Sequence, residues 1–128
     1  WNPRIEAIRA NGIPSVSAAI LQRWFAPGYE ATEDFAMWRA MLERTPADGY
    51  CQVSEAIRDA DYTADLARIT QPTLVIAGAD DASTPPALVK GMAEAIPNAT
   101  YVEIARAGHL PCVEQPAEVA ALLQKHLA

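Results

Sequence analysis

Two short apolar segments of this 128-residue chain lead into residues that could do acid–base chemistry. Segment 73–77 is followed by Asp80 and Asp81, and segment 100–104 is followed by His109. In open α/β sheets, ligands and chemistry lie at the carboxyl ends of the strands. An acid beside a histidine supplies two of the three members of a nucleophile, base and orienter triad, in which the acid holds the imidazole that takes up a proton. We therefore expect Asp81 and His109 to form a catalytic pair.

Other interpretations of the same residues stay open at this point. Asp80 is an alternative to Asp81 as the functional acid, and both acids are suited to capping a following helix. The separation of 28 positions between Asp81 and His109 fits one helix, one strand and two short loops, which favours the pair. The glycine before each site, Gly78 or Gly108, is expected to permit a sharp turn. The second histidine, His126, falls in the last turn of a predicted helix, where a cation suits the helix dipole.

The elements that must position the pair follow from the spacing of apolar residues and prolines. The continuous apolar run 74–76 predicts a strand covered on both faces. Strand, helix, strand and helix in succession form a βαβα unit with parallel strands and a right-handed crossover, here over 73–77, 85–96, 100–104 and 116–127. Two strands alone leave both sheet edges open, so we expect this unit to be the later half of a larger sheet.

Before Pro72 the pattern changes to short amphipathic helices. Apolar positions at helical spacing predict helices over about 3–11 and 14–25. We expect Asn2 to cap the first helix, Thr32 to cap a third, and a capping box beginning at Thr45 to open a fourth. The chain is thus divided into a helical segment, 1–70, and a βαβα segment, 71–128.

A nucleophile is harder to place than the acid and the base. None of the four serines stands in Gly-x-Ser-x-Gly, the turn that raises a nucleophile above a sheet; they are Ser15, Ser17, Ser54 and Ser83. Cys51 precedes Asp81 and His109 in the order nucleophile, acid and base, but it falls inside a predicted helix, where ordinary packing explains it. Cys112 has no stronger claim.

Composition narrows the class of function. With 51% hydrophobic residues the chain can bury a core, and its net charge of −6 without a basic run disfavours nucleic acid as a partner. No apolar stretch reaches the roughly 20 residues of a membrane helix. Without an export pattern, and with only two cysteines, we expect a cytoplasmic protein with free thiols that acts on a small molecule and not at a membrane.

Several motifs resemble one branch of the α/β-hydrolase superfamily, the 3-oxoadipate enol-lactonases. The acid and histidine blocks within 72–116 are similar to those of the superfamily as a whole. Narrower similarities to the lactonases lie in the helical segment and consist of Arg23–Pro27, Met41–Pro46, Gly49-Tyr50 and Glu55–Asp59. The similarity extends over almost the whole chain.

This resemblance implies a fold and a reaction. The fold would be the C-terminal half of an α/β-hydrolase: a helical cap (lid) over residues 1–70, followed by a βαβα part of the core over 71–128. The complete enzyme would hydrolyse 3-oxoadipate enol-lactone, in the β-ketoadipate route of aromatic catabolism. Asp81 and His109 would be catalytic, and no cofactor or metal would be required.

The family places its serine upstream of the cap, in a part of the sequence that these 128 residues do not contain. The resemblance therefore implies a partner, either the N-terminal half of the same hydrolase or a second copy of the chain. For the substrate carboxylate, Arg23, Arg39 and Arg58 are weak candidates, and Trp24 is a candidate pocket wall. The alternatives are another α/β-hydrolase, such as a carboxylesterase or C–C hydrolase, and an inactive fragment that serves as an association module.

Overall fold

Helices and turns make up the first part of the computed structural model, which describes residues 1–128. The chain forms two units: residues 1–22 with 30–61, and residues 23–29 with 62–128. The boundaries of these units do not coincide with the predicted division at residue 70. The assignment of 1–70 as a cap remains a prediction. No helix is long and apolar enough to cross a membrane.

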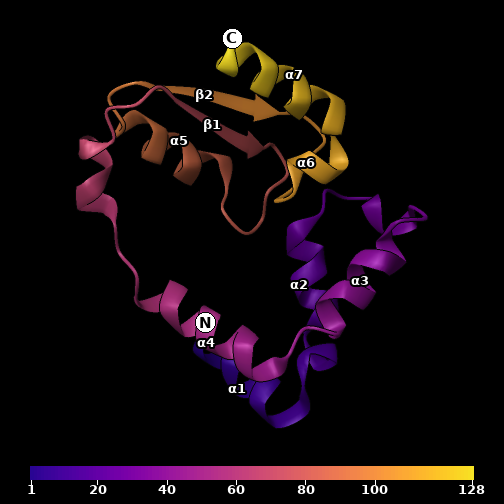
Figure 1. Ribbon diagram of the computed structural model, residues 1–128. Coiled ribbons are helices and arrows are strands. Elements are labelled where there is room, and N and C mark those ends of the chain that lie inside the picture. Colours follow the sequence, from indigo (N-terminus) through magenta and orange to yellow (C-terminus); the bar gives the residue numbers. More distant parts are fainter. The chain divides into compact units, whose positions relative to one another are not determined.

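The first 61 residues contain four α-helices and two 3₁₀ turns (Figure 1). These elements are α1 (Asn2–Asn11), η1 (Ile13–Ser15), α2 (Ser17–Trp24), η2 (Tyr29–Ala31), α3 (Phe35–Glu43) and α4 (Ala47–Asp59). The predicted helix over 14–25 is therefore divided into η1 and α2. The core of the helical unit consists of aliphatic side chains and one thiol: Ile5, Ile8, Ile13, Ile20, Leu21, Leu42 and Cys51.

The predicted side-chain caps of these helices are wrong. Helix α1 begins at Asn2 itself, whose Oδ1 accepts a 2.7 Å hydrogen bond from Arg58. The hydroxyl of Thr45 donates back to the carbonyl of Met41, and Pro46 stands at the start of α4. At α3 the N-cap residue is Asp34 and not Thr32. Polar side chains near these helix ends have partners that sequence spacing alone does not reveal.

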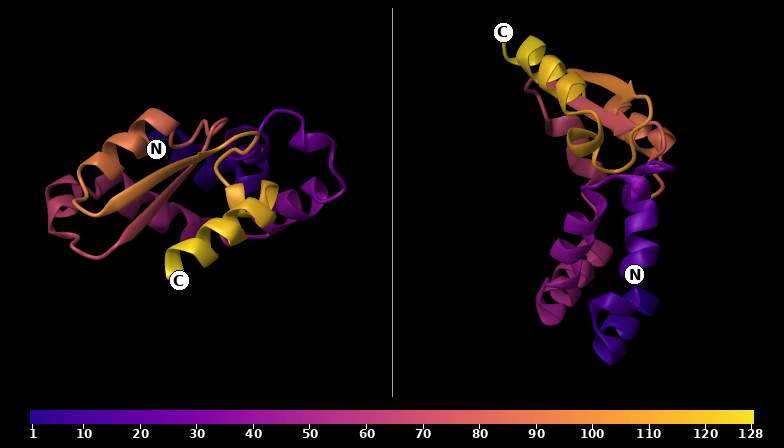
Figure 2. Two further views of the ribbon diagram at one scale, coloured as in Figure 1. Left: turned by 90° about the horizontal axis from the view of Figure 1, so that it is seen from above. Right: turned by 90° about the vertical axis from the view of Figure 1, so that its right-hand side faces the viewer.

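The second unit contains the predicted βαβα arrangement. Strands β1 (Thr73–Gly78) and β2 (Ala99–Ile104) are parallel, and their register runs from Thr73 opposite Ala99 to Gly78 opposite Ile104. The helical elements of this unit are η3 (Thr63–Arg68), α5 (Pro86–Glu94), α6 (Pro111–Glu114) and α7 (Pro116–Leu127). Helices α5 and α7 lie on opposite sides of the strand pair (Figure 1, Figure 2). The fold class inferred from the sequence is confirmed, and α6 and η3 are elements of this unit that were not predicted.

The strand pair is packed mainly on its α5 side. The buried residues on this side are Val75, Ala93 and Ile96. They are contacted by Leu66 of η3 and by Ile69, which directly follows η3. Val75 of β1 thus anchors the sheet to α5. The sheet formed by these 128 residues has two strands, so the outer edge of each is unpaired within the chain.

Gly78 and Gly108 are required for close approach of the backbone, a role that the sequence did not predict. Gly78 also opens the predicted turn, which the N–H of Asp81 closes by donating to its carbonyl. Neither has a positive φ; the left-handed residue in this region is Arg106, with φ of 55°. A Cβ on Gly78 would collide with the carbonyl groups of Ala107 and Gly108. A Cβ on Gly108 would lie 2.6 Å from the carbonyl oxygen of Trp24. Three backbone segments are therefore stacked at distances that only glycine allows.

We predict that Gly108→Ala lowers the free energy of unfolding of the intact protein by about 3 kcal/mol or more, because rigid backbone would have to move. Gly91, inside α5, is the matched control, since a Cβ there meets nothing within 4 Å. Gly91→Ala should stabilise the protein by about 0.5–1 kcal/mol through helix propensity. Denaturant unfolding of both variants checks this, and equal effects at the two positions would contradict the close-approach explanation.

Candidate catalytic site

The two loops that follow β1 and β2 are tied together by their backbones. The N–H of Ala79 donates to the carbonyl of Ile104 at 2.8 Å, and the N–H of Asp80 donates to that of Ala107 at 2.9 Å. A turn is closed by the N–H of Asp81, which donates to Gly78 at 3.1 Å. These bonds leave the Asp80 side chain exposed and place that of Asp81 in a buried position.

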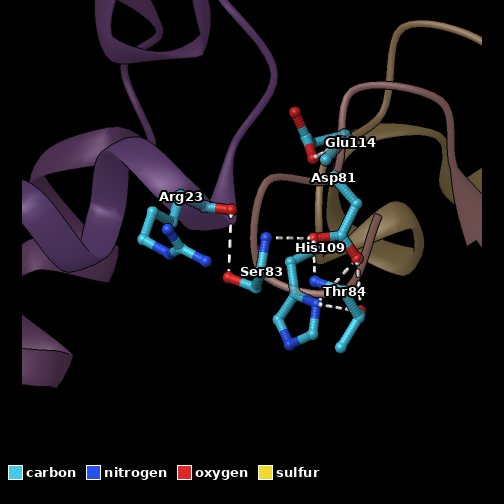
Figure 3. A network of polar contacts seen from close by, with 7 residues as sticks. Arg23, Asp81, Ser83, Thr84, His109 and Glu114 are labelled. Atoms are coloured by element: carbon cyan, nitrogen blue, oxygen red, sulfur yellow. Dashed lines mark hydrogen bonds and ion pairs between the residues drawn. The ribbon is translucent and has the colours of Figure 1, made fainter. Parts of the chain in front are cut away.

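Four donors surround the Asp81 carboxylate (Figure 3). Oδ1 accepts the backbone N–H of Ser83 at 2.7 Å and that of Thr84 at 2.9 Å. Oδ2 accepts the Thr84 hydroxyl at 2.7 Å and lies 2.9 Å from Nδ1 of His109. The sequence offered loop capping and pairing with histidine as alternative roles for the acid, and the structure shows that Asp81 has both contacts.

The imidazole of His109 has a definite orientation. Nδ1 faces Oδ2 of Asp81 and is 3.2 Å from the Thr84 hydroxyl oxygen. Because that hydroxyl uses its hydrogen on Asp81, Nδ1 is assigned as the protonated nitrogen that donates to both oxygens. Nε2 is then an acceptor on the edge of the ring that points away from Asp81 (Figure 3). The His109 side chain is 36% exposed and that of Asp81 only 5%, so the base is accessible and its partner is not.

The pKa of Asp81 results from two opposing causes. Burial of the carboxyl raises its pKa, but hydrogen bonds from His109, Thr84 and Ser83 favour the ionised form and together outweigh burial. The pKa of Asp81 is therefore lowered from its ordinary value. An ionised carboxylate at Oδ2 keeps the proton of the neutral imidazole on Nδ1 and stabilises the imidazolium that forms when Nε2 accepts a proton.

Residues 23–26 contact both loops through their backbone. The Ser83 hydroxyl donates to the carbonyl of Arg23 at 3.2 Å, and the His109 N–H donates to that of Trp24 at 2.7 Å. The chain segment of the two predicted substrate-binding residues thus lies beside the pair (Figure 3). A role of the Arg23 and Trp24 side chains in substrate binding remains a prediction, as it does for Arg39 and Arg58.

Glu114 is a site residue that sequence reasoning missed. Its Oε1 accepts the N–H of Ala26 and its Oε2 accepts the N–H of Gly108, each at 2.7 Å. The carboxylate therefore joins segment 23–29 to the residue immediately before His109. The sequence feature that could have pointed to Glu114 is its position five residues after His109, between Pro111 and Pro116.

The nucleophile candidates inside the chain gain no support from their surroundings. Cys51 is 1% exposed in the core of the helical unit, with its Sγ 3.9 Å from the carbonyl of Ile5. Ser17 is also buried, and its hydroxyl donates to Glu43 at 2.6 Å. Ser83 lies near the pair, but its hydroxyl donates to a backbone carbonyl and not to His109. The site thus contains a carboxylate and an imidazole in contact, without a nucleophile beside them.

Comparison with known proteins identifies the family. Residues 1–122 match the alpha/beta hydrolase family. The chain belongs to this family. In this α/β-hydrolase, Asp81 follows one strand of the parallel sheet and His109 follows the next, and their catalytic roles remain predictions.

Several relatives are enol-lactonases. The chain is 36% identical over 118 residues to 3-oxoadipate enol-lactonase 1 of Acinetobacter baylyi and 35% identical to enol-lactonase 2 of the same organism. The match covers 91% of this chain and 44% of each relative. This α/β-hydrolase chain therefore spans less than half the length of those curated relatives.

Solved structures support the same family assignment. The crystal structure of the enol-lactonase from Burkholderia xenovorans superposes with a TM-score of 0.94 at 33% identity, covering 99% of this chain and 49% of that one. A thermophilic esterase from Thermogutta terrifontis superposes with a TM-score of 0.88 at 29% identity, covering 98% and 48%. The α/β-hydrolase fold of this chain is thus that of part of these enzymes.

We predict that the stabilising effect of Asp81 depends on pH. Its folded-state pKa is below the unfolded value of about 3.9, so ionised Asp81 stabilises the fold above that value. This stabilisation is lost as pH falls through the folded pKa. The stability advantage of the wild type over Asp81→Asn should therefore be largest near pH 6 and shrink at about pH 3 and below. Denaturant unfolding across this range measures it, and the exposed Asp80→Asn is the control that should show no such change.

Proposed function

We propose that this chain supplies the acid and the base of a serine-type hydrolase that opens 3-oxoadipate enol-lactone. The observation that carries the proposal is the 2.9 Å contact between Nδ1 of His109 and Oδ2 of a buried Asp81 carboxylate. This geometry leaves Nε2 as the acceptor of a nucleophile's proton. In the same proposal the serine lies outside these 128 residues, because none of the serines within them stands in Gly-x-Ser-x-Gly.

The proposed reaction has two stages. Nε2 of His109 removes the serine proton as the serine oxygen attacks the lactone carbonyl, and Asp81 stabilises the resulting imidazolium. The ring C–O bond then breaks, and the imidazolium returns its proton to the leaving enol oxygen. Water, deprotonated by His109 in the same way, attacks the acyl-enzyme and releases the free acid and the serine. No metal or redox cofactor takes part in these steps.

The choice of substrate is supported by the relatives. Two proteins named 3-oxoadipate enol-lactonase match 91% of the chain, and an enol-lactonase structure superposes on nearly all of it. The proposed substrate carries a carboxylate, which an arginine can bind. Arg23 is the candidate because its own backbone carbonyl contacts the loop that carries Asp81. Trp24 is proposed as an apolar wall for the same substrate.

A second candidate is a carboxylesterase of broader specificity. It is favoured by the esterase from Thermogutta terrifontis, whose structure superposes on 98% of the chain. The acid and histidine would act in the same way in that enzyme, so the two candidates differ only in what binds beside the pair.

Completion of the enzyme is part of the proposal. The unpaired outer edges of β1 and β2 are suited to further strands, because parallel sheets are normally covered and paired on both sides. We propose that the remainder of the same hydrolase provides these strands together with the serine; a second copy of the chain is the alternative source of strands. The two free thiols, Cys51 and Cys112, agree with the reducing cytoplasm in which we place the enzyme.

We predict that Asp81→Asn lowers turnover by the complete enzyme about 10⁴-fold, roughly 5 kcal/mol of transition-state stabilisation, because the imidazole loses its orienting charge. Asp80→Asn is the matched control one residue away, with an exposed side chain, and should leave turnover unchanged. Steady-state kinetics of both variants checks the assignment. The reverse result, with Asp80 essential and Asp81 dispensable, would assign the acid to the wrong residue.

We predict that the complete enzyme has a higher kcat/KM for 3-oxoadipate enol-lactone than for simple aryl esters. Arg23→Gln should raise KM for the lactone more than for an uncharged ester, because only the lactone has a carboxylate to pair with it. Parallel assays of both substrates with the wild type and this variant measure the difference. Equal or better turnover of the aryl ester would favour the carboxylesterase.

A further inference from the structure

The loop that carries His109 is held in place by contacts with two other segments. Its Gly108 packs against the backbone of residues 24–26, with no room for a Cβ. The N–H of His109 donates to the carbonyl of Trp24 at 2.7 Å. In addition, the carbonyl of Arg106 accepts the Gln115 amide at 3.1 Å. The imidazole can keep its 2.9 Å contact with Asp81 only while this backbone stays where it is.

Two buried N–H groups in this region have the same partner. Ala26 and Gly108 are both buried, and the carboxylate of Glu114 accepts one N–H on each of its oxygens at 2.7 Å. A carboxylate is suited to this place because it accepts on both oxygens and donates from neither. Hydrogen bonds to an ionised acceptor are also stronger than those between neutral groups.

Glu114 is itself positioned by the residues that follow the histidine. The N–H groups of Val113 and Glu114 donate to the carbonyl of Leu110 at 2.8 and 3.1 Å, which forms the single turn of α6. This turn begins two residues after His109, so the carboxylate folds back onto the amide that precedes the histidine. Residues 108–114 therefore form one short loop, which the hydrogen bond from the N–H of Gly108 to the Glu114 carboxylate closes.

We infer that Glu114 is a positioning residue for the catalytic base: its carboxylate joins Ala26 to Gly108 and thereby fixes the imidazole of His109 on Asp81. The Glu114 carboxylate forms no hydrogen bond or ion pair with the imidazole or with Asp81; its partners are the backbone N–H groups of Ala26 and Gly108. The activity part of this inference rests on the proposed function, whereas its effect on the His109–Asp81 hydrogen bond does not.

The variants that test it are Glu114→Gln, which replaces one acceptor with a donor, and Glu118→Gln, an exposed acid in the first turn of α7, as the matched control. We expect Glu114→Gln to lower kcat about 10²-fold, the scale of a 1 Å misplacement of a catalytic group, with KM little changed. Glu118→Gln should retain the wild-type kcat. Activities are compared per folded enzyme, at a temperature at which unfolding curves show every variant to be folded.

The second readout is the downfield proton resonance of the His109 Nδ1–H, which reports its hydrogen bond to Asp81 directly. It should be broadened or lost in Glu114→Gln and retained in Glu118→Gln. Loss of the resonance in His109→Gln secures its assignment. Glu114→Asp, which keeps the charge but is one methylene shorter, should recover part of the resonance and part of kcat.

The outcomes separate this inference from the proposed function. If Glu114→Gln is less stable but has the wild-type kcat and resonance, Glu114 has only a structural role and the inference is overturned. If the resonance is lost in Glu114→Gln while Asp81→Asn retains full turnover, the positioning role stands and the proposed function fails.

Discussion

The register of two parallel strands is the constraint from which the site follows. Gly78 lies opposite Ile104, so β1 and β2 end at the same level and their loops leave the sheet side by side. The loops can then exchange backbone hydrogen bonds, and the acid of one meets the histidine of the other. A slip of one residue would turn every side chain of a strand to the opposite face and separate the two loops.

Asp81 organises its own loop as well as its partner. One carboxylate oxygen is saturated by backbone N–H groups of residues 83 and 84, which gives the loop its shape, and the other accepts from Thr84 and faces His109. The same carboxylate maintains the loop and the contact with His109. A substitution at Asp81 therefore alters the loop and the acid–histidine pair together. The lowered pKa of Asp81 is the electrostatic consequence of that arrangement.

Much of the fold and the central pair could be predicted because they depend on side-chain type. Runs of aliphatic residues identified both strands, prolines identified the starts of α5 and α7, and an acid and a histidine after successive strands identified the pair. Several predictions failed where the partner was backbone. Thr45 was expected to cap α4 but donates to a carbonyl of α3. Residue type says nothing about where a carbonyl or an amide points.

The same limitation explains why the role of Glu114 and the reason for the two glycines were not foreseen. Glu114 accepts only from amides, which every residue except proline has, so no complementary side chain marked its partners. Gly78 and Gly108 were assigned to turns, although what excludes a side chain there is contact between segments about 30 and 80 residues apart in the sequence. Such contacts exist only once the chain has folded.

Residues 23–26 hold the acid and histidine loops with main-chain atoms alone, and this affects how the family can diverge. Any amino acid at positions 23 and 24 would offer the same carbonyl oxygens to Ser83 and His109. The side chains at these two positions can therefore change among related proteins while the hydrogen bonds that support the acid–histidine geometry are preserved.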